Sequence, residues 1–332
     1  MRRGSFPVPR TGVVAPDAHN PGRKTRAAGL SIISNSVLIA LKIGAGVLTG
    51  SIALITEAIH SAVDLVASVV AFFSVRKADQ PADEDHLYGH AKVENLAAAL
   101  EGVLIVLGAA VIIFESVRRL ADPPELESLG VGIAVIALSM VVNLGVSTYL
   151  YRQAHAHDSP ALEGDAAHLR TDALTSGGVL IGLVLVQATG FNALDPAVAL
   201  VVACAIIFSG VRIVSRSSRV LVDEALPPDE LDQIRDAIES NGAPEIHGFH
   251  KLRARRAGSR RYIDLHVQFR RGTTLERAHA LSHDLSESIR KRVRGADVLV
   301  HLEPEDTALR EAPGRDRTGA SAKVDGGRGG HG

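Results

Sequence analysis

The stretch ITEAIHSAVDLVASVV, residues 55–70, decides the fold. Its apolar side chains are those of a membrane-spanning helix, yet His60 and Asp64 lie in its middle. Ionisable side chains within a membrane span are costly to bury, and they usually mark an ion pathway or a proton relay. Residues at i and i+4 share one face of a helix, so these two side chains can act together. The stretch therefore predicts a membrane helix that handles an ion.

Apolar segments of similar length recur along the chain. A span needs about 20 mostly apolar residues, and each segment reaches or approaches that length. The six segments are Leu30–Leu48, Ile52–Val75, Val93–Val117, Leu129–Leu150, Ala166–Ala188 and Ala193–Ile213. The sequence predicts a membrane α-helical fold built on a bundle of six transmembrane helices.

Lys and Arg residues in the connections predict the orientation, because they mark cytoplasmic loops. They occur in the N-terminal arm and after the second, fourth and sixth segments. The connection residues are Arg76, Lys77, Lys92, Arg152, Arg212, Arg216 and Arg219. The opposite connections are short, apart from one that carries Arg118 and Arg119. We expect a multi-pass protein of the cell (inner) membrane, with both termini in the cytoplasm.

Beyond Val222 the sequence becomes charged, and its patterning changes. Residues 227–242 and 274–293 have helical patterns, whereas 246–258, 260–272 and 296–304 read as strands. The order helix, strand, strand, helix, strand predicts a cytosolic α+β domain (αββαβ, metallochaperone-like) with its helices on one face of the sheet.

Four regions follow from this reading. They are a disordered cytosolic arm (1–27), a six-helix transmembrane domain (28–216), a cytosolic domain (222–304) and a disordered tail (305–332). The net charge of −1 argues against a nucleic-acid-binding protein. The sequence has neither a P-loop nor a His-Glu-x-x-His motif, so neither ATP-driven pumping nor zinc hydrolysis is predicted, and the chain is not expected to be an enzyme.

The opening His–Asp pattern returns once, in DAAHLRTDALTSGG (165–178), as His168 and Asp172. Two imidazole nitrogens and two carboxylates that meet at one point form a tetrahedral site suited to Zn²⁺. The ion would cancel the carboxylate charges and so account for ionisable residues inside spans. In the alternative, each pair lies near a span end and hydrogen-bonds to neighbouring helices. Two identical pairs in an apolar bundle favour the metal site, and we expect Asp165 to serve its access path.

The two His-x3-Asp motifs, in the second and fifth of six spans, resemble those of the cation diffusion facilitators, which are proton-coupled exporters of divalent metals. The resemblance covers Leu30 to Pro304. It implies a homodimer in the lipid bilayer that exports Zn²⁺ in exchange for H⁺. The set His60, Asp64, His168 and Asp172 is the version associated with zinc preference. Relatives with Asp at the first position make cadmium or iron the alternative.

The resemblance also implies a second metal site, formed by Asp83, His86 and His90 in the connection after the second span. One coordination position would stay open to water. A solvated acidic loop is the alternative. The resemblance pairs Lys92 with Asp223, a contact that would lock the membrane part to the cytosolic domain and one protomer to another. A Lys that merely snorkels to the interface is the simpler reading.

In the cytosolic domain, five residues match positions at which many relatives bind two zinc ions at the dimer interface. They are His250, His266, His279, His301 and Glu303. Glu303 replaces the commoner Asp. His247 and His283 are taken as surface residues, and His155 and His157 are assigned no site.

Three other functions remain open. The chain could be a membrane-anchored zinc sensor or scaffold whose cytosolic histidines respond to metal. It could transport another divalent metal (Cd, Fe, Co or Mn). A channel is the weakest reading, because tight tetrahedral coordination slows permeation.

Overall fold

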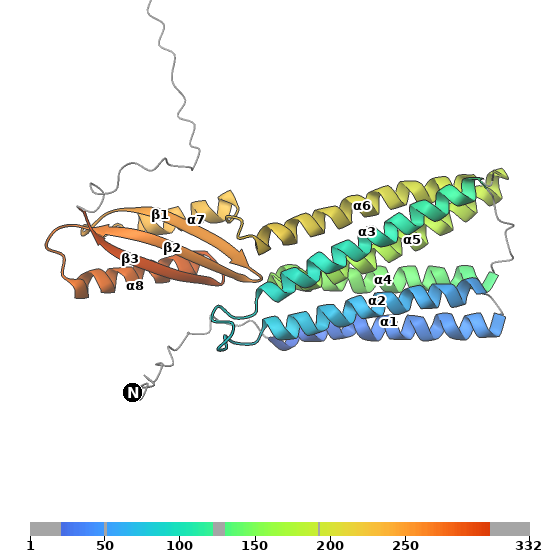
Figure 1. Cartoon of the computed structure of the whole chain (residues 1–332), viewed down its shortest axis with the longest axis horizontal. Coiled ribbons are helices and arrows are strands. Elements are labelled where there is room, and N and C mark those ends of the chain that lie inside the picture. Colours follow the sequence, from blue (N-terminus) through green and yellow to red (C-terminus); the bar gives the residue numbers. More distant parts are fainter. Residues whose placement is uncertain (1–20, 50–51, 122–129, 192, 306–332) are drawn as a thin grey trace, which may run out of the picture.

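The computed structural model describes residues 21–49, 52–121, 130–191 and 193–305. Residues 1–20 and 306–332, which hold most of the predicted arm and tail, lie outside the described residues. Six long helices form one body, and a small α+β domain follows them (Figure 1).

The six helices are longer than the apolar segments that predict them. They are α1 (Pro21–Thr49), α2 (Ile52–Ala78), α3 (Lys92–Ala121), α4 (Gly130–His157), α5 (Pro160–Thr189) and α6 (Leu194–Leu221). All six are long and apolar enough to cross a membrane. Large apolar side chains such as Leu107, Phe114 and Phe208 are exposed on their outer faces, as expected for contact with lipid. The predicted six-helix membrane bundle is confirmed.

The first helix starts earlier than expected. Residues 21–27 were assigned to a disordered arm, but they belong to α1. Lys24 accounts for the difference: its side chain is buried and forms ion pairs with Asp79 at 2.6 Å and with Glu94 at 3.1 Å. This first turn is therefore held in place by contacts with the end of α2 and the start of α3.

The start of α5 also lies ahead of the predicted segment. Ser159 caps this helix, its Oγ accepting a hydrogen bond from the Leu162 N–H, and Pro160 occupies the first turn. Both residues suit these positions, because the cap satisfies a free N–H and Pro needs no donor there. Residues 160–165 are helical as a result, and α5 extends about two turns ahead of His168.

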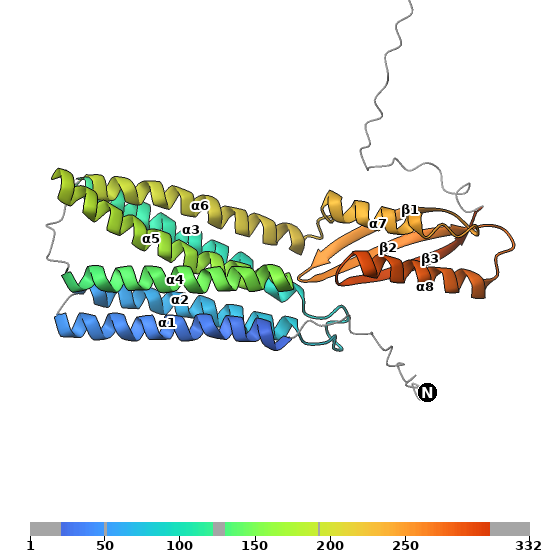
Figure 2. The same ribbon diagram turned by 180° about the vertical axis from the view of Figure 1, so that it is seen from behind.

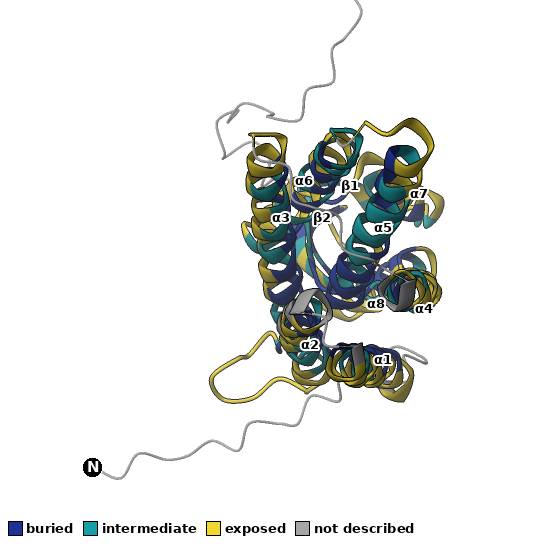
Figure 3. Cartoon of the chain, turned by 90° about the vertical axis from the view of Figure 1, so that its right-hand side faces the viewer, coloured by how far each residue is buried: buried dark blue, intermediate teal, exposed yellow. Residues whose placement is uncertain are grey.

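Neighbouring helices pack as α1 with α2, α4 with α5, and α3 with α6, while α5 also contacts α3 and α6. The view along the bundle shows buried positions facing inward and exposed positions facing outward (Figure 3). The connections α2–α3, α4–α5 and α6–α7 lie at the end nearest the C-terminal domain, here called the domain-facing end (Figures 1 and 2).

The C-terminal domain has the predicted αββαβ order, which is confirmed. Its elements are α7 (Pro228–Ser240), β1 (Ile246–Ala257), β2 (Arg260–Phe269), α8 (Leu275–Arg292) and β3 (Ala296–Pro304). The sheet order is β1-β2-β3, with β1 antiparallel and β3 parallel to β2. Alternate residues of β2, among them Ile263 and Leu265, are buried against Ile234 of α7 and Leu285 of α8. This apolar core fixes the sheet on the two helices.

The β1–β2 hairpin docks on the domain-facing end of the bundle. At its tip, Gly258 has a φ of +55°, and its N–H donates to Asn95 Oδ1 at 3.0 Å. A Cβ at this position would lie 2.7 Å from the Ala91 carbonyl oxygen, so both the backbone conformation and the close approach require glycine.

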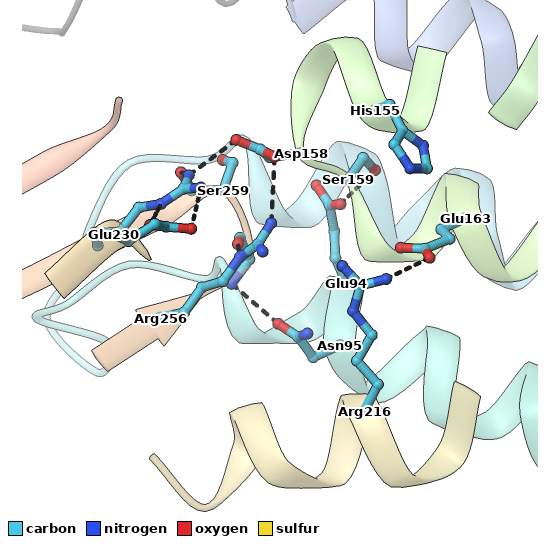
Figure 4. A network of polar contacts seen from close by, with 12 residues as sticks. Glu94, Asn95, His155, Asp158, Ser159, Glu163, Arg216, Glu230, Arg256 and Ser259 are labelled. Atoms are coloured by element: carbon cyan, nitrogen blue, oxygen red, sulfur yellow. Dashed lines mark hydrogen bonds and ion pairs between the residues drawn. The ribbon is translucent and has the colours of Figure 1, made fainter. Parts of the chain in front are cut away.

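An ion-pair network surrounds the same contact (Figure 4). Arg261 of β2 is buried, and its guanidinium donates to Asp158 in the α4–α5 connection at 2.9 Å. It also donates to Glu230 of α7 at 2.9 Å, and Arg256 lies 3.5 Å from Asp158. The domain is therefore tied to the connection that leads directly into α5.

Candidate metal centres

The first candidate centre lies inside the bundle, where α2 meets α5. Asp64, His168 and Asp172 each offer a ligand atom, and these atoms lie within 4.8 Å of one another. His168 Nε2 is 3.1 Å from Asp64 Oδ1, and the two residues are 7% and 6% exposed. Two helices far apart in sequence thus bring one imidazole and two carboxylates to a single buried point, here called the bundle cluster.

The fourth predicted ligand, His60, lies one helical turn before Asp64 in α2. Its side chain is outside the described residues. Because i and i+4 positions share a helix face, the backbone of α2 is compatible with a fourth ligand at this centre.

The donor set of the bundle cluster suits a divalent cation. Imidazole nitrogen and carboxylate oxygen are both ligands of Zn²⁺ and of several transition metals. Among the described residues, His168 Nδ1 is buried and has no hydrogen-bond partner. Carboxylates inside an apolar bundle need a positive partner, which a bound cation supplies.

The second candidate centre is the α2–α3 connection. Asp83 Oδ1 lies 3.0 Å from His86 Nδ1, and Asp83 Oδ2 lies 3.1 Å from His90 Nε2. His90 is only 4% exposed. Its contact with Asp83 is not aligned as a hydrogen bond, and within the described chain neither ring nitrogen forms one. Partial burial acts to raise the pKa of the Asp83 carboxyl, but hydrogen bonds from His86 outweigh it and hold this pKa below its usual value. The three side chains form a preassembled group of metal-ligand type.

The predicted partner of Lys92 is present. Lys92 Nζ donates to Asp223 Oδ1 at 2.7 Å, and Arg255 donates to Asp223 Oδ2 at 2.8 Å. The Arg255 guanidinium also lies over the rings of Tyr88 and Tyr262, and the Tyr262 hydroxyl donates to the Tyr88 carbonyl at 2.8 Å. In this single chain, these contacts join the α2–α3 connection to the C-terminal domain.

The Asp223 contact should make stability depend on pH in the acidic range. The hydrogen bond from Lys92 lowers the pKa of Asp223, and Arg255 adds to the effect. The folded-state pKa is therefore below the unfolded value of about 4. The stabilisation is fully present above pH ~4 and is lost as pH falls through the folded value. We expect Asp223→Asn to lower the melting temperature at neutral pH, with the difference closing below pH ~4.

Thermal unfolding of the full chain in detergent, followed between neutral and acidic pH, measures this effect. Asp297→Asn is the matched control, because Asp297 is an exposed carboxylate in β3 of the same domain. A gap between Asp223→Asn and the wild type that stays constant down to the lowest pH would contradict the assigned contact.

The third candidate centre lies across the sheet. His250 and His266 are directly opposite on β1 and β2, and His266 is opposite His301 on β3. Glu303 accepts from His250 Nε2 at 2.8 Å and from His266 Nδ1 at 2.5 Å. Burial acts to raise the pKa of Glu303, but these two contacts outweigh it and hold the pKa below its usual value. His250, His266 and Glu303 form the sheet cluster, with ligand atoms within 4.8 Å of one another.

Two predicted ligands are not part of the sheet cluster in this chain. His301 Nε2 lies 3.7 Å from Glu303 Oε1, at the margin of the cluster. His279 lies on α8, where its ring contacts that of His283 with centroids 4.8 Å apart. The family resemblance groups the five residues, whereas the fold of one chain gathers three of them.

Sequence reasoning singled out Asp165 but missed Glu94 and Glu101, two other buried polar residues of the bundle. Glu94 of α3 accepts from Lys24 and forms a short contact with the Ser159 hydroxyl. Deeper in the bundle, Asp165 accepts from Ser31 and Ser68 at 3.0 Å each. The available signal was the pair Glu94 and Glu101 in a mostly apolar segment, since residues two turns apart share a helix face.

Comparisons with known proteins match nearly the whole described chain. Residues 29–222 match the family described as "Cation efflux transmembrane domain", and residues 226–305 match "Cation efflux protein, cytoplasmic domain".

Two relatives are similar over most of their length. The cation-efflux pump FieF of Yersinia pestis is 37% identical, over 85% of this chain and 93% of that protein. An uncharacterized transporter of Synechocystis is 35% identical, over 83% of this chain and 89% of that protein. Among solved structures, one of CzrB, titled a putative zinc transporter, is 32% identical and covers 24% of this chain and 98% of that chain, with a TM-score of 0.24.

Proposed function

Because the chain belongs to the cation efflux (cation diffusion facilitator) family, we propose that it exports Zn²⁺ from the cytoplasm in exchange for protons. The observation that carries the proposal is the bundle cluster. Asp64, His168 and Asp172 are metal-type ligands that converge within an apolar helix bundle. A secondary transporter uses such a site near the midplane and exposes it alternately to the two sides.

Proton coupling follows from the chemistry of the ligands. Imidazole and carboxylate bind a metal only in their deprotonated forms, so metal and protons compete for the same atoms. An ordinary imidazole titrates near pH 6.5, within the range of cellular pH gradients. Zn²⁺ would bind from the cytoplasm as the ligands lose protons, and protons arriving from the outer side would displace it after the bundle has changed its exposure.

The choice of Zn²⁺ rests on the mixed nitrogen and oxygen donor set. Two imidazoles and two carboxylates, counting His60, match the coordination that Zn²⁺ prefers. A site that is richer in oxygen would suit harder cations better. Cd²⁺, Fe²⁺, Co²⁺ and Mn²⁺ are the competing substrates to include in any test.

The other centres complete the proposal. Asp83, His86 and His90 would hold a metal at the α2–α3 connection, and the sheet cluster would hold metal in a cytoplasmic domain through which two copies of the chain form a homodimer. The domains are then the helix bundle, residues 21–221, and the metal-binding unit, residues 222–304. The arrangement proposed is a multi-pass protein of the inner membrane with both termini in the cytoplasm.

Vesicle transport tests the proposal. Full-length protein is reconstituted into liposomes that contain a zinc-sensitive dye, and a pH gradient is imposed with the acidic side inside. We expect zinc uptake that depends on the protein and stops when an ionophore collapses the gradient. Cd²⁺, Fe²⁺, Co²⁺ and Mn²⁺ are assayed under the same conditions.

Two outcomes would contradict the proposal. Zinc uptake that is insensitive to the pH gradient would remove the proton exchange, and absence of uptake for every metal would remove the transport function. A preference for another cation would keep the exporter but replace its substrate.

The sheet cluster is the observation that favours the second candidate, a membrane-anchored zinc sensor. The full-length double variant His250→Ala/His266→Ala distinguishes the two. An exporter keeps its uptake at saturating zinc, because the bundle cluster is unchanged. A sensor shows no uptake in either form, and the double variant loses only zinc binding by the domain.

A further inference from the structure

Glu101 of α3 differs from the other buried carboxylates of the bundle. It is 0% exposed, and within the described parts of the chain neither of its carboxylate oxygens has a hydrogen-bond partner. Buried carboxylates in proteins are normally hydrogen-bonded, paired with a cation or bound to a metal. Glu94, two turns earlier on the same face, follows that rule through Lys24 and Ser159. Glu101 therefore lacks a hydrogen-bond partner among the described residues, and a bound cation would fill that role.

Glu101 lies beneath a polar pocket at the domain-facing end. The pocket has a volume of about 60 Å³, enough for a few water molecules. Ala98 and Gly164 are among its lining residues. A Cβ at Gly164 would lie 3.2 Å from the Glu101 Cδ and 3.2 Å from the Ala98 Cα. The absent side chain of Gly164 thus makes room for the carboxyl group directly below the pocket.

The mouth of the pocket carries charged and titratable groups. Figure 4 shows His155, Glu163 and Arg216 near one another there. Arg216 donates to Glu163 at 2.5 Å, and this ion pair crosses from α6 to α5. Arg256 also lines the pocket, so a cation would enter it past carboxylate and guanidinium groups that are partly paired with one another.

Glu101 also adjoins the part of α5 that leads to the bundle cluster. Its carboxyl group occupies the space beside Gly164, which directly precedes Asp165, and Asp165 lies one turn before His168 on α5. Asp165 is fully buried, and its Oδ2, unlike Oδ1, has no hydrogen-bond partner among the described residues. The carboxylates of Glu101 and Asp165 therefore lie between the pocket floor and the imidazole of His168, which contacts Asp64.

We propose that Glu101, together with Asp165, forms a second binding position for the transported divalent cation, between the pocket and the bundle cluster. This inference rests on the proposed function and deepens it. A stepwise path of weak oxygen ligands lowers the cost of bringing a dehydrating cation through an apolar bundle. The position is weaker than the bundle cluster, because it has no nitrogen ligand of its own, so it delivers the ion rather than retaining it.

Transport kinetics test the proposal with Glu101→Gln, which keeps the shape of the side chain and removes its charge. In the vesicle assay we expect the KM for zinc to rise on the order of tenfold, with the rate at saturating zinc within about twofold of wild type. Glu101→Asp, which keeps the charge, should recover most of the loss. Glu115→Gln, on the same helix but half-exposed and paired with Arg119, is the matched control and should leave the KM unchanged.

A labelling experiment gives a second readout that does not depend on transport. Cys204 is the single native cysteine, so Cys204→Ser provides a background for Glu101→Cys. Cd²⁺ should slow maleimide labelling of Glu101→Cys several-fold but leave Glu115→Cys unaffected.

Each result decides the proposal. An unchanged KM in Glu101→Gln, or labelling of Glu101→Cys that Cd²⁺ does not slow, would overturn it while wild-type transport stands. Equal loss of saturating rate and of zinc affinity would place Glu101 in the bundle cluster itself and would also overturn it. If wild-type vesicles take up no metal, the proposed function fails first, and the labelling result still decides whether Glu101 binds a cation.

Discussion

Asp172→Asn is expected to lower proton-driven zinc uptake by more than about 100-fold, because loss of a partner that only orients a metal ligand already costs 10–100-fold. The amide keeps the size of the carboxylate but removes a negative charge from a centre whose other described ligands are Asp64 and His168. With one carboxylate fewer where α5 and α2 meet, the remaining ligands neutralise less of the charge of a divalent cation in the apolar bundle.

Uptake into liposomes at equal protein density measures the effect, and calorimetric zinc titration of the purified chain counts the sites that remain. Glu115→Gln is the control, since it removes a carboxylate from a membrane helix away from the cluster. The titration should show one site fewer than wild type, with zinc binding by the C-terminal domain unchanged. Near-normal uptake by Asp172→Asn would exclude the bundle cluster as the transport site.

Arg261→Ala should produce the largest loss of stability at the junction between bundle and domain. Arg261 is buried and donates to both Asp158 and Glu230. Its removal takes this partner from Glu230 and leaves Asp158 with the longer Arg256 contact at 3.5 Å. Breaking a buried ion pair from one side costs 3–5 kcal/mol, and we expect about 3 kcal/mol here because both carboxylates are partly exposed. The hairpin should also separate from the bundle.

Denaturant unfolding of the full chain gives the free energy, and the distance between spin labels on α4 and β2 reports the separation. Arg260→Ala is the control: Arg260 is the exposed neighbour on the same strand. Arg261→Lys should recover only part of the stability, because an ammonium group cannot reproduce the forked donors of guanidinium. A loss no larger in Arg261→Ala than in Arg260→Ala would refute the role given to this network.

The sequence predicted the helices and the bundle cluster for the same physical reason. A long apolar run in a membrane protein can satisfy its backbone only as a helix, so length and composition suffice. Within such runs the pairs His60–Asp64 and His168–Asp172 are conspicuous, and the i and i+4 spacing puts the two members of each pair on one helix face. Asp64, His168 and Asp172 lie close together in the structure, and their role as metal ligands stays a prediction.

Contacts between distant segments that carry no repeated motif were beyond that reasoning. Lys24 reads as part of a basic arm, and its place inside the bundle depends on Asp79 and Glu94. Asp158 looks like an ordinary connection residue until β2 brings Arg261 to it. Such pairings arise from how the helices and the sheet are positioned in three dimensions, for which a single sequence carries no periodic signal.

The lengths of the helices have a consequence for the lipid. A helix the length of α3, with 30 residues, extends about 45 Å, whereas the hydrocarbon layer is about 30 Å thick. Even with a tilt of about 20°, roughly a quarter of such a rod stands clear of the acyl chains. The β1–β2 hairpin then contacts helix ends that project into the headgroup layer or into water. A thicker or thinner bilayer would therefore change how much of this contact is exposed to water.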